Sequence, residues 1–102
     1  MAITSKQRAQ LRGMAMSIDT IIQIGKRGIT ESVVDYVSAA LKARELVKGK
    51  VLENSMLTAR EACDELGEKC RAEGIQVIGT KFVLYKRNEK EPKKVLVKDK
   101  KK

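Results

Sequence analysis

Along the first part of the chain, apolar residues recur with the 3.6-residue period of a helix. The sequence TSKQ at residues 4–7 forms a capping box, so a helix is expected from about Ser5 to Met16. Its apolar side consists of Leu11, Met14, Ala15 and Ile18. The cations Lys6, Arg8 and Arg12 lie off that side with no acid between them, which favours an anionic partner over a plain solvated face.

Two further segments have helical spacing. One begins after Thr30, a suitable N-cap, and runs to about Glu45. The other follows a second capping box, TARE at residues 58–61, and has an inward apolar stripe of Ala59, Ala62, Cys63, Leu66 and Cys70. Gly74 is expected as its C′ residue, just beyond the helix end.

Four short segments have the composition of strands. They are residues 21–24, 46–52, 75–78 and 81–86. The last two are separated only by Gly79 and Thr80, and a two-residue loop with glycine first suits a type II′ turn, so these strands should be antiparallel neighbours.

The predicted order is therefore one N-terminal helix followed by β-α-β-α-β-β. Strand-helix-strand units have a strong right-handed preference, so we expect an α/β (α+β two-layer) domain with a mixed four-stranded sheet and the second and third helices on one face. The position of the first helix is left open by these patterns. The domain is expected to span residues 1–86, and residues 87–102 are expected to form a basic disordered tail, in which KVLV could add an edge strand.

Charge is concentrated at the two ends of this chain of 102 residues, which has a net charge of +9. Residues 1–28 hold five cations and one anion, residues 29–85 hold eight and nine, and residues 86–102 hold nine and three. Such a distribution favours nucleic acid or an acidic membrane surface as the partner.

Several kinds of chemistry are excluded or disfavoured. The chain contains no histidine, which removes Ser-His or Cys-His nucleophiles and histidine-ligated zinc. Cys63 and Cys70 are seven residues apart in a predicted helix, too far for a disulfide, and are expected to be buried thiols. No segment approaches a membrane span or a signal peptide, so we expect a cytosolic protein without metal or cofactor.

The loop GKRG, from Gly25 to Gly28, lies between a predicted strand and a predicted helix. Glycines let another backbone approach, helix N-H groups and the helix dipole favour an anion, and Lys26 and Arg27 add two charges that phosphate oxygens could use. By itself the motif also fits a plain reversing turn, and it lacks the Walker spacing of nucleotide hydrolases. The basic first helix and tail favour the phosphate-binding interpretation.

Aromatic residues are too few for a base-stacking platform. Only Tyr36, Phe82 and Tyr85 are present, and Phe82 and Tyr85 fall on opposite faces of the last strand, so at least one should pack in the core. Recognition by phosphate and shape is therefore expected, with affinity that falls steeply as salt increases.

Four stretches in the same order, SKQRAQLRGMA, IIQIGKRGITESVVDYVSAAL, ELVKGKVLE and IQVIGTKFVLYKR, closely resemble the YhbY family. This family is the bacterial stand-alone form of the CRM domain (chloroplast RNA splicing and ribosome maturation), and the resemblance covers about residues 4–87. It implies a fold similar to the C-terminal domain of translation initiation factor three, with an added N-terminal helix. Family members often carry histidines after the LRG segment, where this chain has MAMSI, and the lysine-rich tail is outside the family pattern.

The resemblance also implies a function. RNA would be bound through the loop residues Gly25, Lys26, Arg27 and Gly28 and through Lys6, Arg8 and Arg12 of the first helix. Bacterial members are associated with precursors of the large ribosomal subunit, and plant relatives with group II intron splicing. The resulting hypothesis is a non-enzymatic RNA-binding protein that acts on ribosomal RNA in ribosome assembly, with no small-molecule substrate. The alternative is a protein-interaction module that uses the sheet edge or the tail.

Overall fold

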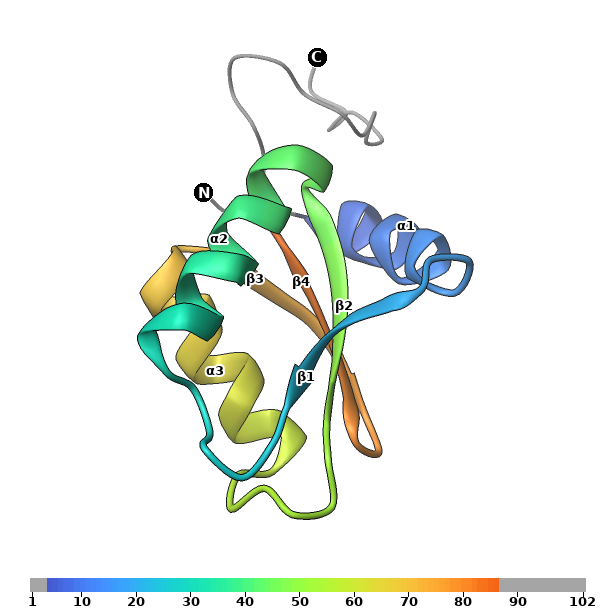
Figure 1. Ribbon diagram of the computed structural model, residues 1–102. Coiled ribbons are helices and arrows are strands. Elements are labelled where there is room, and N and C mark those ends of the chain that lie inside the picture. Colours follow the sequence, from blue (N-terminus) through green and yellow to red (C-terminus); the bar gives the residue numbers. More distant parts are fainter. Residues whose placement is uncertain (1–3, 87–102) are drawn as a thin grey trace.

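The computed structural model describes residues 4–86 and contains three helices and four strands (Figure 1). These are α1 (Ser5–Ala15), β1 (Thr20–Ile24), α2 (Glu31–Arg44), β2 (Leu46–Val51), α3 (Ala59–Cys70), β3 (Glu73–Ile78) and β4 (Lys81–Tyr85). The predicted order of elements is confirmed. The predictions for residues 87–102, including the edge strand at KVLV, lie outside the described residues.

A threonine begins each of the three helices. The hydroxyl oxygen of Thr4 accepts a hydrogen bond from the Gln7 backbone N-H, and the Gln7 side chain accepts one from the Thr4 N-H, both at 3.1 Å. Thr58 and Glu61 form the same reciprocal pair at 3.1 and 2.9 Å. The hydroxyl of Thr30 accepts from the Val33 N-H at 3.2 Å. Both predicted capping boxes are therefore confirmed, and the helix starts are fixed by interactions within four residues.

The sheet is mixed, as predicted, with the strand order β1-β2-β4-β3. β1 and β2 are parallel, because α2 carries the chain back between them, whereas β4 is antiparallel to both of its neighbours. The turn between β3 and β4 consists of Gly79 and Thr80, with Ile78 directly opposite Lys81. Gly79 has a φ of 59°, which the first central residue of a type II′ turn requires.

Helices cover the two faces of the sheet unequally. α2 and α3 pack on one face, around a core that includes Ile24, Leu41, Leu66 and Phe82. α1 lies on the opposite face, where Leu11 and Ala15 pack against Leu46, Ile75, Val83 and Tyr85. The apolar side predicted for the first helix is the side that packs against the sheet. The sequence did not predict which face of the sheet this helix covers.

The predicted end of the third helix is wrong. α3 ends at Cys70, Arg71 takes the left-handed conformation with a φ of 57°, and the Ala72 N-H donates to the Gly67 carbonyl oxygen at 2.8 Å. Gly74 instead lies in β3, where a Cβ atom would be only 3.0 Å from the Cys63 sulfur. This glycine therefore serves the close packing of α3 on the sheet and does not end the helix.

Cys63 and Cys70 are buried and free, as predicted. Burial raises the pKa of the Cys63 thiol to about 11, with a further rise from Asp64 and an opposing effect of Arg60. Burial also raises the pKa of the Cys70 thiol, against lowering effects of Lys86 and Ser38. Both thiols therefore stay protonated near neutral pH and act as small apolar side chains of the core.

Candidate nucleic-acid interface

The GKRG loop connects β1 to α2 through a tight turn. The Gly28 N-H donates to the Gly25 carbonyl oxygen at 3.0 Å, which closes the turn and leaves Lys26 and Arg27 exposed at its tip. Gly28 has a φ of 71°, a conformation that residues with a Cβ atom rarely adopt. Gly25 has no such requirement, because a Cβ atom there would lie at ordinary contact distances of 3.6 and 3.7 Å from Leu52 and Asn54.

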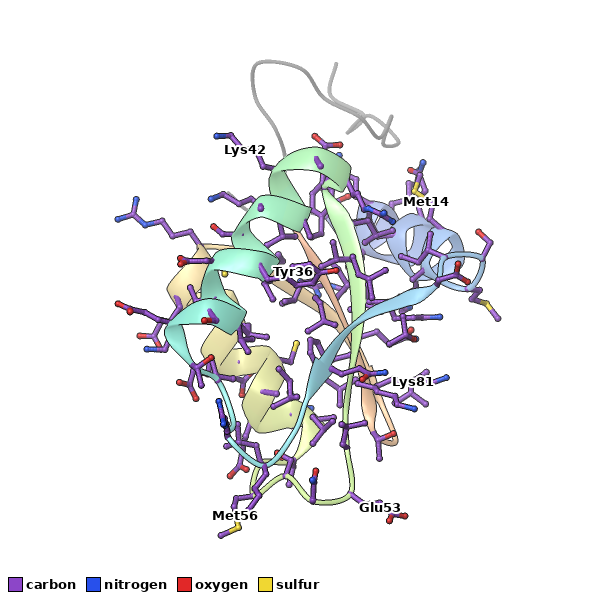
Figure 2. The ribbon with its side chains drawn as sticks, in the orientation of Figure 1. Met14, Tyr36, Lys42, Glu53, Met56 and Lys81 are labelled. Carbon is purple, nitrogen blue, oxygen red and sulfur yellow. The ribbon has the colours of Figure 1, made fainter. Side chains whose placement is uncertain are left out.

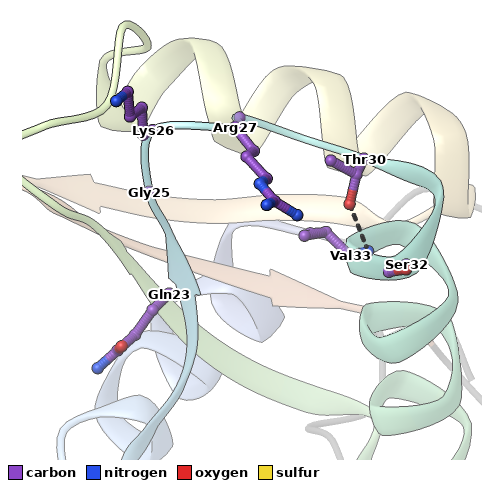
Figure 3. A pocket seen from close by; sticks show the side chains of 8 residues that line it. Gln23, Gly25, Lys26, Arg27, Thr30, Ser32 and Val33 are labelled. Atoms are coloured by element: carbon purple, nitrogen blue, oxygen red, sulfur yellow. Dashed lines mark hydrogen bonds between the residues drawn. The ribbon is translucent and has the colours of Figure 1, made fainter.

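An open pocket of about 630 Å³ lies between this loop and the first turn of α2 (Figure 3). Its lining residues are Gln23, Gly25, Lys26, Arg27, Gly28, Thr30, Ser32 and Val33, none of them acidic. The Arg27 side chain extends from the loop toward the first turn of α2, whereas Lys26 points away from it. A ligand in the pocket would therefore meet one guanidinium group directly and a second cation at the edge.

The first turn of α2 adds hydrogen-bond donors to this pocket. Thr30 satisfies the Val33 N-H, and the first bond within the helix is from the Val34 N-H to the Thr30 carbonyl oxygen. The N-H groups of Glu31 and Ser32 have no acceptor among residues 4–86. Unpaired N-H groups at a helix N-terminus, together with the helix dipole, suit a phosphate oxygen.

The loop between β2 and α3 packs beside the GKRG loop. Because β1 and β2 are parallel, their carboxyl ends meet at one edge of the sheet, and the loop between β2 and α3 lies beside the GKRG loop (Figure 1). The Leu52 N-H donates to the Ile24 carbonyl oxygen at 2.8 Å, and Leu57 approaches the Cβ position of Gly28 at 3.9 Å. Sequence reasoning did not include this loop, although the parallel order of the strands is the signal that places it there.

The predicted site residues fall into two separate groups. The GKRG loop follows Ile24, and Ile24 pairs with Val51 at the end of β2. Arg8 of α1 contacts Glu73 of β3. Glu73 pairs with Tyr85 of β4, which in turn pairs with Leu46 at the start of β2. Loop and Arg8 are thus at opposite ends of the sheet.

The three cations of α1 have different surroundings. Arg8 donates to the Glu73 carboxylate at 3.0 Å and to the Gly74 carbonyl oxygen at 2.6 Å, so it joins α1 to β3. Lys6 is exposed and Arg12 is half-buried. The acid that sequence reasoning did not find opposite these cations is Glu73, which is 65 residues away from Arg8 in the chain.

The sequence profile of the CRS1 / YhbY (CRM) domain family matches residues 3–86, a range that contains all of the described residues. The chain belongs to the CRM domain family. The resemblance seen in the sequence is thereby confirmed.

Relatives of this CRM domain carry names that refer to RNA. It is 36% identical over 87 residues to a Bacillus subtilis protein named "Probable RNA-binding protein YqeI", covering 85% of this chain and 91% of the relative. It is 30% identical over 87 residues to a Haemophilus influenzae protein named "RNA-binding protein", covering 85% and 88%. The solution structure of a Staphylococcus aureus protein matches with a TM-score of 0.67 and 37% identity, covering 91% of this chain and 95% of the other.

Aromatic side chains of this CRM domain are mostly inside it. Phe82 and Tyr85 lie on opposite faces of β4, as predicted, and both are buried, because α1 covers the face to which Tyr85 points. Tyr36 is 53% exposed on α2 and is the one exposed aromatic side chain of residues 4–86. The sheet therefore presents no aromatic platform in the described part, in keeping with recognition through phosphates.

Residues 4–86 include no helix that is both long and apolar enough to cross a membrane. In the same part of the chain, no three Cys, Asp or Glu side chains gather as a group that could hold a metal ion.

Proposed function

We propose that this CRM domain is a cytosolic, non-enzymatic RNA-binding protein that acts in assembly of the large ribosomal subunit, and that the GKRG loop grips the RNA backbone. The observation that carries the proposal is the pocket beside the loop. It combines the guanidinium group of Arg27, the nearby Lys26 and the free N-H groups at the start of α2, with no acid among its lining residues. This set of donors suits a phosphodiester, which has charged oxygens but no need of a deep apolar pocket.

The expected mode of binding assigns a role to each part of the loop. One phosphate lies over the first turn of α2 and accepts from Ser32 N-H and Arg27, while Lys26 neutralises the next phosphate along the strand. Gly28 fixes the turn, and Gly25 lets the backbone of the RNA come close. The names of the relatives support RNA as the ligand class. Ribosomal RNA as the target rests on the family resemblance stated for the sequence.

The α1 cations are proposed as a separate contact. Because they lie at the other end of the sheet from the loop, an RNA that touches both groups must extend along the domain. Lys6, which is exposed, is the most accessible of the three. Arg8 keeps its contacts with Glu73 and Gly74 and would reach RNA only at the cost of one of them.

Charge reversal at the loop is the test in vitro. The variant Lys26→Glu/Arg27→Glu is compared with Lys42→Glu/Arg44→Glu, which makes the same change in net charge at the other end of α2, about 20 Å away. Filter binding to transcribed large-subunit ribosomal RNA in about 0.15 M salt should show at least a tenfold loss of affinity for the loop variant and a much smaller loss for the control. Equal losses would mean that only net charge matters and would refute the loop assignment.

A test in cells addresses the target. The tagged protein is crosslinked to RNA and the recovered RNA is sequenced, with the loop variant run in parallel. Reads concentrated on large-subunit ribosomal RNA and lost in the variant would support the proposal. Scattered reads would contradict it, and a partner protein captured equally well after nuclease treatment would favour the protein-interaction alternative.

A further inference from the structure

Half of the sheet face on the side of α1 is not covered by that helix. α1 packs over the part of the sheet formed by Leu46, Ile75, Val83 and Tyr85. Toward the other end of the strands the same face carries Ile78, which is 63% exposed, and Lys81, which is also exposed. Figure 2 shows Lys81 pointing away from α2 and α3, on the side where α1 lies. This open half of the sheet is adjacent to the GKRG loop end.

The register of the strands sets four side chains in one row across this open half. Gln23 of β1 pairs with Lys50 of β2, Lys50 pairs with Lys81 of β4, and Lys81 pairs with Ile78 of β3. Their neighbours Ile24, Val51 and Phe82 belong to the core on the other face, so alternation directs the row outward. With a strand spacing of about 4.8 Å, the row is about 14 Å long.

The charges in this row are all of one sign. Lys50 and Lys81 are directly opposite each other, an arrangement that destabilises a sheet unless something neutralises it. Lys48 lies on the same face two residues before Lys50, and its ammonium group donates to the Ile18 carbonyl oxygen at 3.4 Å. No acid of residues 4–86 forms an ion pair with any of these three lysines. The surface is complementary to a polyanion.

A small groove adjoins the lysines at the end of α1. Its volume is about 230 Å³, and its lining residues are Ala15, Met16, Lys48, Gln76, Ile78, Lys81 and Val83. Met16 at the rim is 82% exposed, which is unusual for a large apolar side chain. The volume is below that of sites that enclose a drug-sized molecule, about 300–1,000 Å³, and suits a single planar group. Apolar side chains next to two lysines match a nucleotide, which has an apolar base face and an anionic phosphate.

This surface and the loop pocket meet at Gln23. The residue lines the edge of the pocket, and its side chain, the first of the row, points away from Arg27 and α2 (Figure 3). We propose that the open half of the sheet is a second RNA-contact surface, in which Lys50 and Lys81 hold phosphates of the strand that leaves the GKRG loop and the groove beside Met16 and Ile78 takes one unpaired base. This inference rests on the proposed function. An acidic membrane is disfavoured as the occupant, because the patch lacks the Trp, Phe or Leu side chains of interfacial surfaces.

The test uses the full chain and a labelled 12-nucleotide single-stranded RNA, with binding followed by fluorescence anisotropy over a range of salt. In Lys50→Gln/Lys81→Gln the affinity should fall about tenfold near 0.1 M salt, and the slope of log K against log salt should become shallower by about 1.4 for two phosphates. The thermal midpoint should stay equal or rise, because the repulsion between the lysines is removed. If this variant binds RNA more weakly but is as stable as wild type or more stable, Lys50 and Lys81 serve RNA binding and not folding.

A second variant tests the groove. Ile78→Ser should lower the affinity several-fold with no change in the salt slope, because the lost contact is with a base and not with a phosphate. The control Lys42→Gln/Arg44→Gln removes two charges at the far end of α2 and should leave the slope within about 0.3 of the wild type.

The possible failures are distinguishable. Affinity lost in the loop variant but unchanged in Lys50→Gln/Lys81→Gln would overturn this inference and leave the proposed function standing. If the wild-type protein binds neither this RNA nor ribosomal RNA, both the proposed function and this inference are overturned. Vesicles of acidic phospholipid that bind the wild type, and compete with the RNA for Lys50 and Lys81, would overturn the choice of RNA as the occupant.

Discussion

Replacement of each glycine of the GKRG loop by alanine should have different effects on stability. Gly28 has a φ of 71° and Gly25 is not in the left-handed region, although both are in the same turn. A Cβ atom would meet no close neighbour at Gly28, where the nearest atom is a Leu57 methyl at 3.9 Å. Any loss of stability in Gly28→Ala therefore comes from the backbone and not from a steric contact with another residue.

The magnitude follows from two opposing effects. Left-handed backbone costs a residue with a Cβ atom about 1–2 kcal/mol, and alanine returns about 0.4–1 kcal/mol by restricting the unfolded chain. The net loss for Gly28→Ala is about 1 kcal/mol, which lowers the thermal midpoint of a domain of this size by about 4–8 °C. For Gly25→Ala the first effect is absent, and the new methyl group makes ordinary contacts at 3.6 and 3.7 Å, so stability should stay equal or rise slightly.

Thermal unfolding followed by circular dichroism, together with urea denaturation, measures both variants. Gly28→Asn is the matched control, because asparagine tolerates the left-handed region better than alanine and should recover part of the loss. Anisotropy with RNA is measured on the same samples. Gly25→Ala should bind RNA more weakly than wild type while remaining as stable, since the added methyl stands where the RNA backbone would approach.

Two outcomes would refute this reasoning. If Gly28→Ala unfolds at the wild-type temperature, the turn does not need a left-handed residue there. If Gly25→Ala binds RNA as well as wild type, close approach of the RNA backbone at that glycine is wrong, and the first glycine of the loop has no part in binding.

Two further predictions concern the scaffold. Arg8→Ala should lower the free energy of unfolding by about 1–2 kcal/mol and Glu73→Ala by less, because only Arg8 also donates to the Gly74 carbonyl oxygen. A double-mutant cycle of Arg8 and Glu73, measured by urea denaturation, should give a coupling energy of about 0.5–1 kcal/mol. The control Arg12→Ala should have a free energy of unfolding within about 0.5 kcal/mol of wild type. The pKa of the Cys63 thiol is raised from 9.0 to about 11, so the protonated thiol favours the folded state fully below pH 9 and this contribution is lost as the pH rises toward 11. Over that interval the free energy of unfolding, measured by urea denaturation, should therefore fall less in Cys63→Ala than in wild type. An equal fall in both proteins would contradict the raised pKa of Cys63.

Local signals in the sequence predicted the parts of the fold that depend on near neighbours. Thr4 with Gln7 and Thr58 with Glu61 are three residues apart, and each pair specifies a helix start without reference to the rest of the chain. The hairpin at Gly79 is equally local. The end of α3 was predicted wrongly because Gly74 has the residue type of a helix end, while the reason for it, the nearby sulfur of Cys63, lies on another element.

The candidate site shows the same division. Gly25 to Gly28 are contiguous and were proposed as a site from the sequence, and their place at the end of β1 followed from the order of elements. The docking of α1 could not be predicted, because a stripe such as Leu11 and Ala15 fits either face of a sheet. The contact of Arg8 with Glu73 depends on that docking, and the pairing of Lys50 with Lys81 depends on the register between β2 and β4. Composition and spacing determine neither of them.

The near-neutral balance of residues 29–85 conceals a separation of charge in space. Helix α3, which covers one face of the sheet, carries four acids, Glu61, Asp64, Glu65 and Glu68, against two cations, Arg60 and Lys69. Lysines 48, 50 and 81 are on the opposite face, and Lys26 and Arg27 extend from the end of the sheet. A polyanion is therefore repelled from the outer side of α3 and attracted to the loop and the open half of the sheet, so RNA should meet the domain in one orientation before any short-range contact forms. Salt should slow this association, because it screens a field that no single ion pair produces.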